Sequence, residues 1–205
     1  MTELIKRSRG RPKGSGLNGR LRVFTQGELD RLLSSASRFS KKYDFAMNLA
    51  YYLAMRVGEL IALRVEDFNT AARQVTIRAE KQGFTKTYDL PDRLWHKYQR
   101  WMREREPKDS PWVFPHRIYG DEHMADDSVQ GTFRTLCHRA GIPGQHSIHD
   151  LRHTAATSMA TAGDGITQIA GWLRHRAIVS SQRYIAYREN REHEAKMKAR
   201  YSGGL

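Results

Sequence analysis

Cysteine occurs once in the 205 residues, as Cys137. One cysteine forms neither an intrachain disulfide nor a cysteine-rich zinc site, so the class of small disulfide-stabilised proteins is excluded. Long apolar runs are also missing. The most apolar stretch, from Phe45 to Met55, is interrupted by Asn48 and is too short to cross a bilayer. The basic N-terminus has no apolar core, so we do not expect a secretory signal there.

Acidic residues are scarce relative to basic ones. The chain has 22 aspartates and glutamates against 35 lysines and arginines, and its formal net charge is +13. An excess this large indicates a polyanionic partner, and nucleic acid is the first candidate. A membrane surface is the alternative, but the chain has no long amphipathic lysine-rich helix that could lie on lipid. We therefore expect a nucleic acid as the partner and no membrane.

The basic charge is densest in residues 1–23, which carry seven basic residues and one acidic residue. This segment cannot bury apolar area, so we expect it to be disordered when the protein is alone. Its "RGRP" sequence resembles an AT-hook, a motif that places arginines in a narrow minor groove. We expect Arg9, Arg11 and Lys13 to bind DNA, and the alternative is a nonspecific basic tail.

After this tail, the residue pattern predicts a mainly α-helical domain with one small antiparallel β-hairpin. Thr25 and Glu28 form a capping box, which predicts a helix from there to about Ala36. The hairpin is expected from Gln74–Ala79 and Thr85–Leu90, where apolar and polar residues alternate. Further helices are expected at about 42–55, 59–63, 94–103, 127–140, 149–162, 166–174 and 178–187, with a separate exposed or partner-docking helix at 188–200.

The densest group of chemically useful residues is His149-Asp150-Leu151-Arg152-His153. His149 and Arg152 are three residues apart and share a helix face. An arginine fork matches phosphate oxygens, and a histidine moves protons near neutral pH. The alternative is an ordinary polar helix N-terminus. Together with His146, the histidines could suggest a metal, but no further ligand follows a familiar pattern, so we expect no metal.

Four more candidates lie far apart along the chain. Arg56 lies in "MRVGEL", Lys81 at the predicted hairpin tip, and Tyr184 nine residues after His175. Taken singly, each has an ordinary structural explanation: Arg56 could pair with Glu59, Lys81 could be a solvated turn residue, and Tyr184 could be half-buried.

Taken in order, these residues resemble the catalytic series of the tyrosine recombinases, the phage integrase family. That series is arginine, a hairpin lysine, His-x-x-Arg, histidine and tyrosine. The surrounding sequence is similar too, in "LAMRVGELIALRVEDF", "HDLRHTAATSMATAG" and "IAGWLRHRAIVSSQRYIAY". The resemblance covers about Phe24 to Tyr187 and implies the family's catalytic-domain fold over residues 24–188.

The resemblance also implies a mechanism that needs no metal, cofactor or ATP. A tyrosine attacks the scissile phosphate, which leaves a 3′-phosphotyrosyl bond and a free 5′-hydroxyl, and the reaction then reverses onto another strand. The implied catalytic residues are Arg56, Lys81, His149, Arg152, His175 and Tyr184. Among them His149 is expected to position the nucleophile or accept its proton, and Lys81 to protonate the leaving oxygen. Glu59 is expected to orient neighbouring groups, and Tyr187 is a rival nucleophile.

The chain departs from the family in three ways. The segment around Arg56 has Ala54-Met55 where Thr-Gly is common. Arg174 stands where the family usually has glycine, so we expect an extra positive charge beside the active site and a contact with DNA. Only about 23 residues precede the catalytic domain, where most members carry a separate DNA-clamping domain. The chain is similar in this respect to the short fimbrial phase-variation invertases.

By the same resemblance we expect a homotetramer on DNA, a monomer or weak oligomer without it, and an accessory DNA-bending protein as a further partner. Residues 189–205 are expected to dock on a neighbouring protomer. The expected location is the cytoplasm, in a bacterial nucleoid or in a host cell if a phage encodes the protein. The outcome could be integration, excision or inversion. The alternatives are a catalytically silent DNA-binding regulator of the same fold, a DNA-relaxing enzyme with similar chemistry, and a helical adaptor.

Overall fold

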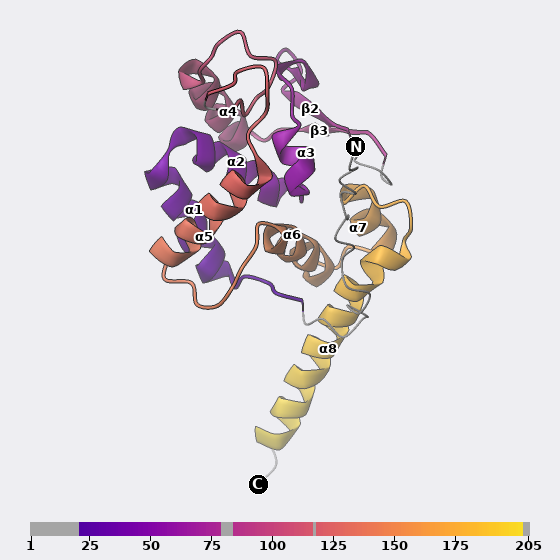
Figure 1. Ribbon diagram of the computed structural model, residues 1–205. Coiled ribbons are helices and arrows are strands. Elements are labelled where there is room, and N and C mark those ends of the chain that lie inside the picture. Colours follow the sequence, from indigo (N-terminus) through magenta and orange to yellow (C-terminus); the bar gives the residue numbers. More distant parts are fainter. Residues whose placement is uncertain (1–20, 79–83, 117, 203–205) are drawn as a thin grey trace, which may run out of the picture.

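The computed structural model describes residues 21–78, 84–116 and 118–202, and these ranges are mainly helical with one small antiparallel sheet (Figure 1). This confirms the predicted fold class. The elements are α1 (Gln26–Phe39), α2 (Lys41–Tyr52), α3 (Val57–Ile61), η1 (Val65–Asp67), β1 (Phe68–Asn69), β2 (Gln74–Ile77), β3 (Lys86–Asp89), α4 (Asp92–Glu104), α5 (Asp126–Arg139), α6 (His149–Thr161), α7 (Ile166–Trp172) and α8 (Val179–Ser202).

The start of the domain is fixed by the predicted capping box. The Glu28 carboxylate accepts a hydrogen bond from the Thr25 backbone nitrogen at 2.8 Å, and the Glu28 backbone nitrogen donates to the Thr25 hydroxyl at 3.3 Å. Ser40 then ends α1 and caps α2, because its hydroxyl accepts from the Tyr43 nitrogen at 3.2 Å. One residue therefore joins the two helices, and they pack closely against each other.

The predicted hairpin is confirmed and forms two strands of a three-stranded sheet. β2 pairs antiparallel with β3, so that Val75 faces Tyr88 and Thr76 faces Thr87. The third strand, β1, pairs with β2 over two residues, which is too short to give a periodic sequence signal. Val75, Ile77 and Tyr88 point into the core, so the base of the hairpin is attached to the domain.

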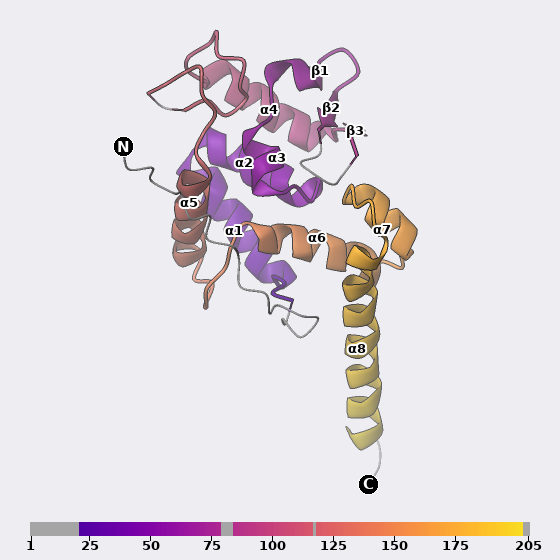
Figure 2. The ribbon, with the colours of Figure 1, turned by 45° about the vertical axis from the view of Figure 1, so that its right-hand side comes forward.

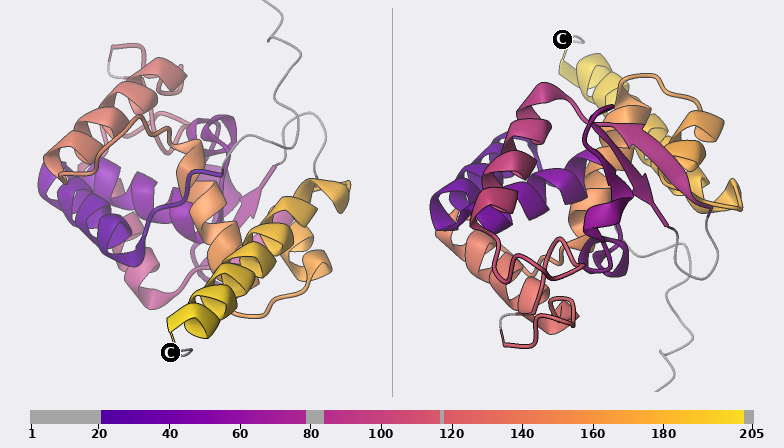
Figure 3. Two further views of the ribbon diagram at one scale, coloured as in Figure 1. Left: turned by 90° about the horizontal axis from the view of Figure 1, so that it is seen from below. Right: turned by 90° about the horizontal axis from the view of Figure 1, so that it is seen from above.

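Two apolar clusters hold the helices together. The larger cluster joins α1, α2, α4 and α5 to the sheet, and the smaller one joins α6, α7 and α8. Ala155, Ala156 and Ala160 provide small side chains in the smaller cluster, which lets α8 lie close to α6. Viewed from above and below in Figure 3, α6 lies between α1 and α2 on one side and α8 on the other. Two of the candidate residues, His149 and Arg152, lie in the first turns of this central helix.

The C-terminal part is one long helix. The sequence predicted a helix at 178–187 and a separate one at 188–200, but α8 runs without a break from Val179 to Ser202. No glycine or proline occurs in this span to end it. Its second half extends away from the body (Figure 2), and its residues from 189 to 200 are exposed. Among the described residues, no helix is both long and apolar enough to cross a membrane.

Candidate active site

Arg152 lies at the centre of the candidate site and is 1% exposed. Its guanidinium donates hydrogen bonds to two backbone carbonyls, those of Ala54 and Leu173, the latter at 2.6 Å from Nη2. These carbonyls belong to the connections after α2 and after α7, so two distant parts of the chain hold one side chain. Ala54 adopts a φ of 48°, a left-handed conformation that is unfavourable for alanine.

His175 contacts the same guanidinium. Its Nε2 lies 2.9 Å from Arg152 Nη2, and its Nδ1 lies 2.9 Å from the Ser181 hydroxyl oxygen. Because an arginine only donates, Nε2 must accept, so the ring proton lies on Nδ1 and is donated to Ser181. Burial lowers the pKa of His175 to about 4, with further lowering by the positive charges of Arg152 and Arg56. The imidazole is therefore neutral at physiological pH.

This assignment predicts that His175 does not titrate near its ordinary pKa. In the DNA-free protein, nitrogen-15 NMR of the imidazole is expected to show the neutral Nδ1-protonated tautomer from neutral pH down to about pH 4. The His175→Asn variant identifies the resonance by its loss. A His175 signal that titrates near pH 6.5 would contradict the hydrogen-bond arrangement.

Arg56, Arg152 and Arg174 form a group that we call the arginine cluster. Arg56 lies at the N-terminus of α3 and caps this helix. Its backbone nitrogen donates to Glu59 Oε2 at 2.9 Å, and its Nη1 donates to Glu59 Oε1 at 2.8 Å. The Arg56 side chain is 32% exposed, whereas Glu59 is fully enclosed. Part of the Arg56 side chain thus remains accessible from solvent, while its Nη1 is held by the Glu59 carboxylate.

Glu59 connects the three arginines of this region. Besides Arg56, it accepts from Arg174 Nη2 at 2.6 Å, and it lies 3.9 Å from Arg152 Nη1. Burial alone would raise the pKa of Glu59, but the positive charge and hydrogen bond of Arg174, together with its other donors, hold the pKa below its ordinary value. The carboxylate is therefore ionised and balances the buried positive charge.

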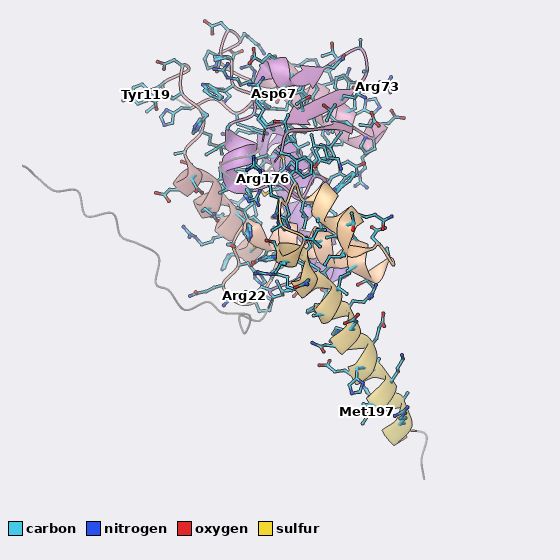
Figure 4. The ribbon with its side chains drawn as sticks, turned by 90° about the vertical axis from the view of Figure 1, so that its right-hand side faces the viewer. Arg22, Asp67, Arg73, Tyr119, Arg176 and Met197 are labelled. Carbon is cyan, nitrogen blue, oxygen red and sulfur yellow. The ribbon has the colours of Figure 1, made fainter. Side chains whose placement is uncertain are left out.

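Arg174 adds a positive charge beside the site, as expected, but its side chain is enclosed, and its contact with DNA stays a prediction. Arg174 is 0% exposed, and it donates to Glu59, to the Tyr88 hydroxyl at 2.6 Å and to the Leu53 carbonyl at 3.1 Å. Its φ is 58°, a left-handed conformation that glycine adopts at no steric cost, which explains why glycine suits this position. Exposed positive charge close to the site comes instead from Arg176, on the connection between α7 and α8 (Figure 4), and from Arg183 on α8.

Tyr184 is buried in the smaller apolar cluster and is 2% exposed. Its hydroxyl lies 3.0 Å from His153 Nδ1. Burial raises the pKa of Tyr184, and the positive charges of Arg152, Arg183 and Arg56 lower it by less. The phenol is thus protonated at neutral pH, and it lies within the field of the arginine cluster.

The contact with His153 differs from the expectation that His149 serves the nucleophile. The two histidines are one helical turn apart on α6, and their rings meet edge to face, with centroids 4.7 Å apart. Helical spacing places both on one face, so the sequence alone does not choose between them. His146 is engaged elsewhere, because its Nδ1 lies 3.1 Å from Asp150 and its ring stacks on Phe24.

Four predicted site residues, Lys81, Arg9, Arg11 and Lys13, lie outside the described residues. The two strands that flank residues 79–83 are nevertheless anchored to the site, because Tyr88 of β3 binds Arg174. Within the described ranges, no three histidine, cysteine, aspartate or glutamate side chains are grouped so that they could hold a metal ion.

The amino-acid sequence and the fold were compared with those of known proteins. Residues 22–191 match the phage integrase family. Among curated proteins, tyrosine recombinase XerA of Pyrococcus furiosus is 29% identical over 161 residues, which cover 78% of this chain and 55% of the relative. The type 1 fimbriae regulatory protein FimB of Escherichia coli K12 is 24% identical over 180 residues, which cover 85% of this chain and 88% of the relative. The chain therefore spans about half the length of XerA and most of the length of FimB.

Solved structures show the same fold. The crystal structure of XerA recombinase aligns with a TM-score of 0.71 at 23% identity and covers 79% of this chain and 57% of the other. A post-cleavage complex of XerH site-specific recombinase with its difH substrate aligns with a TM-score of 0.72 at 19% identity and covers 86% and 53%. Since the family match covers most of the chain and the fold agrees, this protein belongs to the phage integrase family, as a tyrosine recombinase catalytic domain.

Proposed function

We propose that this protein is a site-specific recombinase that cleaves and rejoins double-stranded DNA through a 3′-phosphotyrosyl intermediate. The observation that carries the proposal is the buried tyrosine Tyr184 in the field of Arg56 and Arg152, with His175 bonded to Arg152. These groups come from four separate elements, and packing alone requires no such convergence of charge.

The residue types suit phosphoryl transfer. In the transition state, negative charge spreads over the nonbridging phosphate oxygens, and fixed donors directed at these oxygens stabilise it. Arg152 is held by two backbone carbonyls and by His175, so little reorganisation is needed when a phosphate arrives. Removing one such donor costs about 10²–10³ in rate in comparable oxyanion sites. The proposed acid for the leaving 5′-oxygen is Lys81, and the chemistry requires no metal or ATP.

Covalent trapping tests the proposal. The full chain is incubated with labelled, nicked duplex fragments from DNA that flanks its own gene, in EDTA and without ATP, and is then run on a denaturing gel. We expect a protein–DNA adduct, and mass spectrometry of its peptides is expected to place the nucleotide on Tyr184. DNA binding without an adduct on any fragment would favour the alternative, a silent DNA-binding regulator.

We further propose that the protein acts as a homotetramer on DNA, with the exposed end of α8 docking on a neighbouring protomer and an accessory DNA-bending protein assisting assembly. Residues 188–200 carry five basic and three acidic residues, and Met197 near the end of the helix is 42% exposed (Figure 4). This segment extends away from its own domain, which leaves it available to another chain.

Deleting residues 190–205 is therefore expected to reduce strand exchange much more than DNA binding. The distal half of α8 is exposed along its length, so its loss removes little of the core. Binding is measured by gel shift and exchange with two labelled sites. Equal losses of binding and exchange would contradict the docking role.

The basic segment 1–20 is proposed to add DNA affinity through Arg9, Arg11 and Lys13. Deleting residues 2–20 is expected to weaken binding severalfold at moderate salt. The slope of affinity against salt is expected to become shallower, because fewer neutralised phosphates release fewer counterions. A deletion variant with unchanged affinity and slope would show that the segment does not contribute.

A further inference from the structure

The buried hydroxyl of Tyr184 is hydrogen-bonded to a residue that the catalytic series does not include. His153 Nδ1 lies 3.0 Å from the hydroxyl oxygen. Since the phenol is protonated, it donates this hydrogen bond, so Nδ1 carries a lone pair and the ring proton is on Nε2. The imidazole is already in the tautomer that can receive the phenolic proton.

A proton acceptor is needed here for a physical reason. A tyrosine has an ordinary pKa of about 10, and burial raises the pKa of Tyr184 further. With 2% of the residue exposed, bulk water has little access to take the proton. A general base must lie within about 2.6–3.2 Å of the atom that it deprotonates, and His153 meets that condition in the DNA-free protein.

The charges around His153 allow it to act near neutral pH. Burial lowers the pKa of His153, the nearby Asp150 raises it, and the positive charges of Arg183 on α8 and Arg152 on α6 lower it. The net direction is downward from 6.5, so the imidazole is neutral at pH 7 and able to accept. Once protonated, it is favoured by the negative charge of Asp150.

We propose that His153 is the proton acceptor for Tyr184 during DNA cleavage. The inference rests on the recombinase function proposed above. The phenolic proton moves to His153 Nδ1 as the phenolic oxygen forms its bond to phosphorus. The bond from phosphorus to the 5′-oxygen breaks, and that oxygen takes a proton from Lys81, the expected acid. When the strands rejoin, both protons return along the same paths.

The test separates deprotonation of the nucleophile from protonation of the leaving group. A nicked duplex whose bridging 5′-oxygen is replaced by sulfur releases a thiolate that needs no acid. Its cleavage rate then reports on the nucleophile. The variant is His153→Gln. The glutamine oxygen can accept a hydrogen bond from Tyr184, but the amide does not take up a proton at neutral pH. His149→Gln, one helical turn away, is the comparison variant. Because His149 belongs to the implied catalytic series, its loss is expected to lower the rate but to leave the dependence of that rate on His153 in place.

For His153→Gln we expect a loss of adduct formation of about 10² or more at pH 7 with both substrates, a typical effect of removing general-base catalysis. The rate of this variant is expected to keep rising with pH. The wild-type rate is expected to fall only on the acid side of the ordinary histidine pKa of about 6.5, because burial lowers the pKa of His153. Replacing Tyr184 with a fluorinated tyrosine, which ionises more readily, is expected to restore part of the lost rate. The cleavage rate of His149→Gln is expected still to fall at low pH, as in the wild type, because His153 is intact.

Three results would overturn the proposal. A His153→Gln rate equal to wild type would mean that the contact only packs the tyrosine, and a faster rate would mean that His153 restrains it. A loss in His149→Gln alone would assign proton transfer to that residue. The wild-type pH profile on the sulfur substrate provides a check that does not depend on any variant folding. Absence of an adduct in the wild type would instead overturn the recombinase function itself.

Discussion

Replacing Tyr184 with phenylalanine is expected to abolish the covalent adduct while leaving the fold and the DNA affinity intact. The change removes one oxygen, and the ring that packs among Ala155, Ala156 and Leu173 stays in place. Removing the hydrogen bond to His153 costs about 1 kcal/mol of stability, the usual net value for such a bond. Adduct on nicked DNA and affinity in a gel shift are measured side by side.

The matched control is Tyr187→Phe, three residues later on the same helix. Tyr187 is half-buried beside α6, so its replacement perturbs the same region without touching the arginine cluster. We expect its adduct yield to equal that of the wild type. An adduct that persists in Tyr184→Phe and disappears in Tyr187→Phe would identify Tyr187 as the nucleophile.

Replacing Glu59 with leucine is expected to lower the free energy of unfolding by about 3–5 kcal/mol, the range found when one partner of a buried ion pair is removed. Arg174 and Arg152 are 0% and 1% exposed and would keep their charges without this carboxylate. The decrease is measured by urea unfolding, which follows stability at constant temperature. Because Glu59 links three arginines, adduct formation is expected to fall as well.

Two further variants test whether the loss of stability in Glu59→Leu comes from the buried charges. Asp92→Asn removes an exposed pair, in which Arg73 Nη1 lies 2.7 Å from the Asp92 carboxylate, and it is expected to cost no more than about 1 kcal/mol. Adding Arg174→Met to Glu59→Leu removes one of the unpaired charges and is expected to recover part of the stability. Equal losses for Glu59→Leu and Asp92→Asn would contradict the assigned role of the buried carboxylate.

The same carboxylate makes stability depend on pH in a defined direction. The pKa of Glu59 in the folded protein is below the value of 4.5 for a free side chain, with Arg174 as the main cause of the lowering. Its contribution is therefore present above about pH 4.5, the unfolded-state value, and is lost as pH falls through the folded-state pKa. In Glu59→Leu this acid-side decrease is expected to be smaller.

Local sequence signals predicted most of the fold. The capping box at Thr25 and Glu28, the alternation in β2 and β3, and the helical periods all depend on residues close together in the chain. The order of the candidate residues along the chain predicted that they form one site, and the structure brings Arg56, Arg152 and His175 together. The helices and the hairpin are the features for which neighbouring residues carry the information.

The sequence was less informative where residues far apart in the chain determine the contacts. Arg174 looked like surface charge because its partner Glu59 lies 115 positions earlier, and no local pattern reveals a pair that forms only on folding. His149 and His153 lie on the same face of α6, and the placement of α8 against that face brings the Tyr184 hydroxyl within 3.0 Å of His153. The length of α8 could have been predicted from its lack of glycine and proline.

That uninterrupted helix has a mechanical consequence. Tyr184 lies in the second turn of α8, and the exposed end near Arg200 is about 24 Å away at 1.5 Å per residue. A helix with no hinge residue transmits a tilt along its length. A displacement of the far end therefore tilts the first turns of α8 as well. It shifts the phenol of Tyr184, the proposed nucleophile, relative to His153 without any contact inside the site.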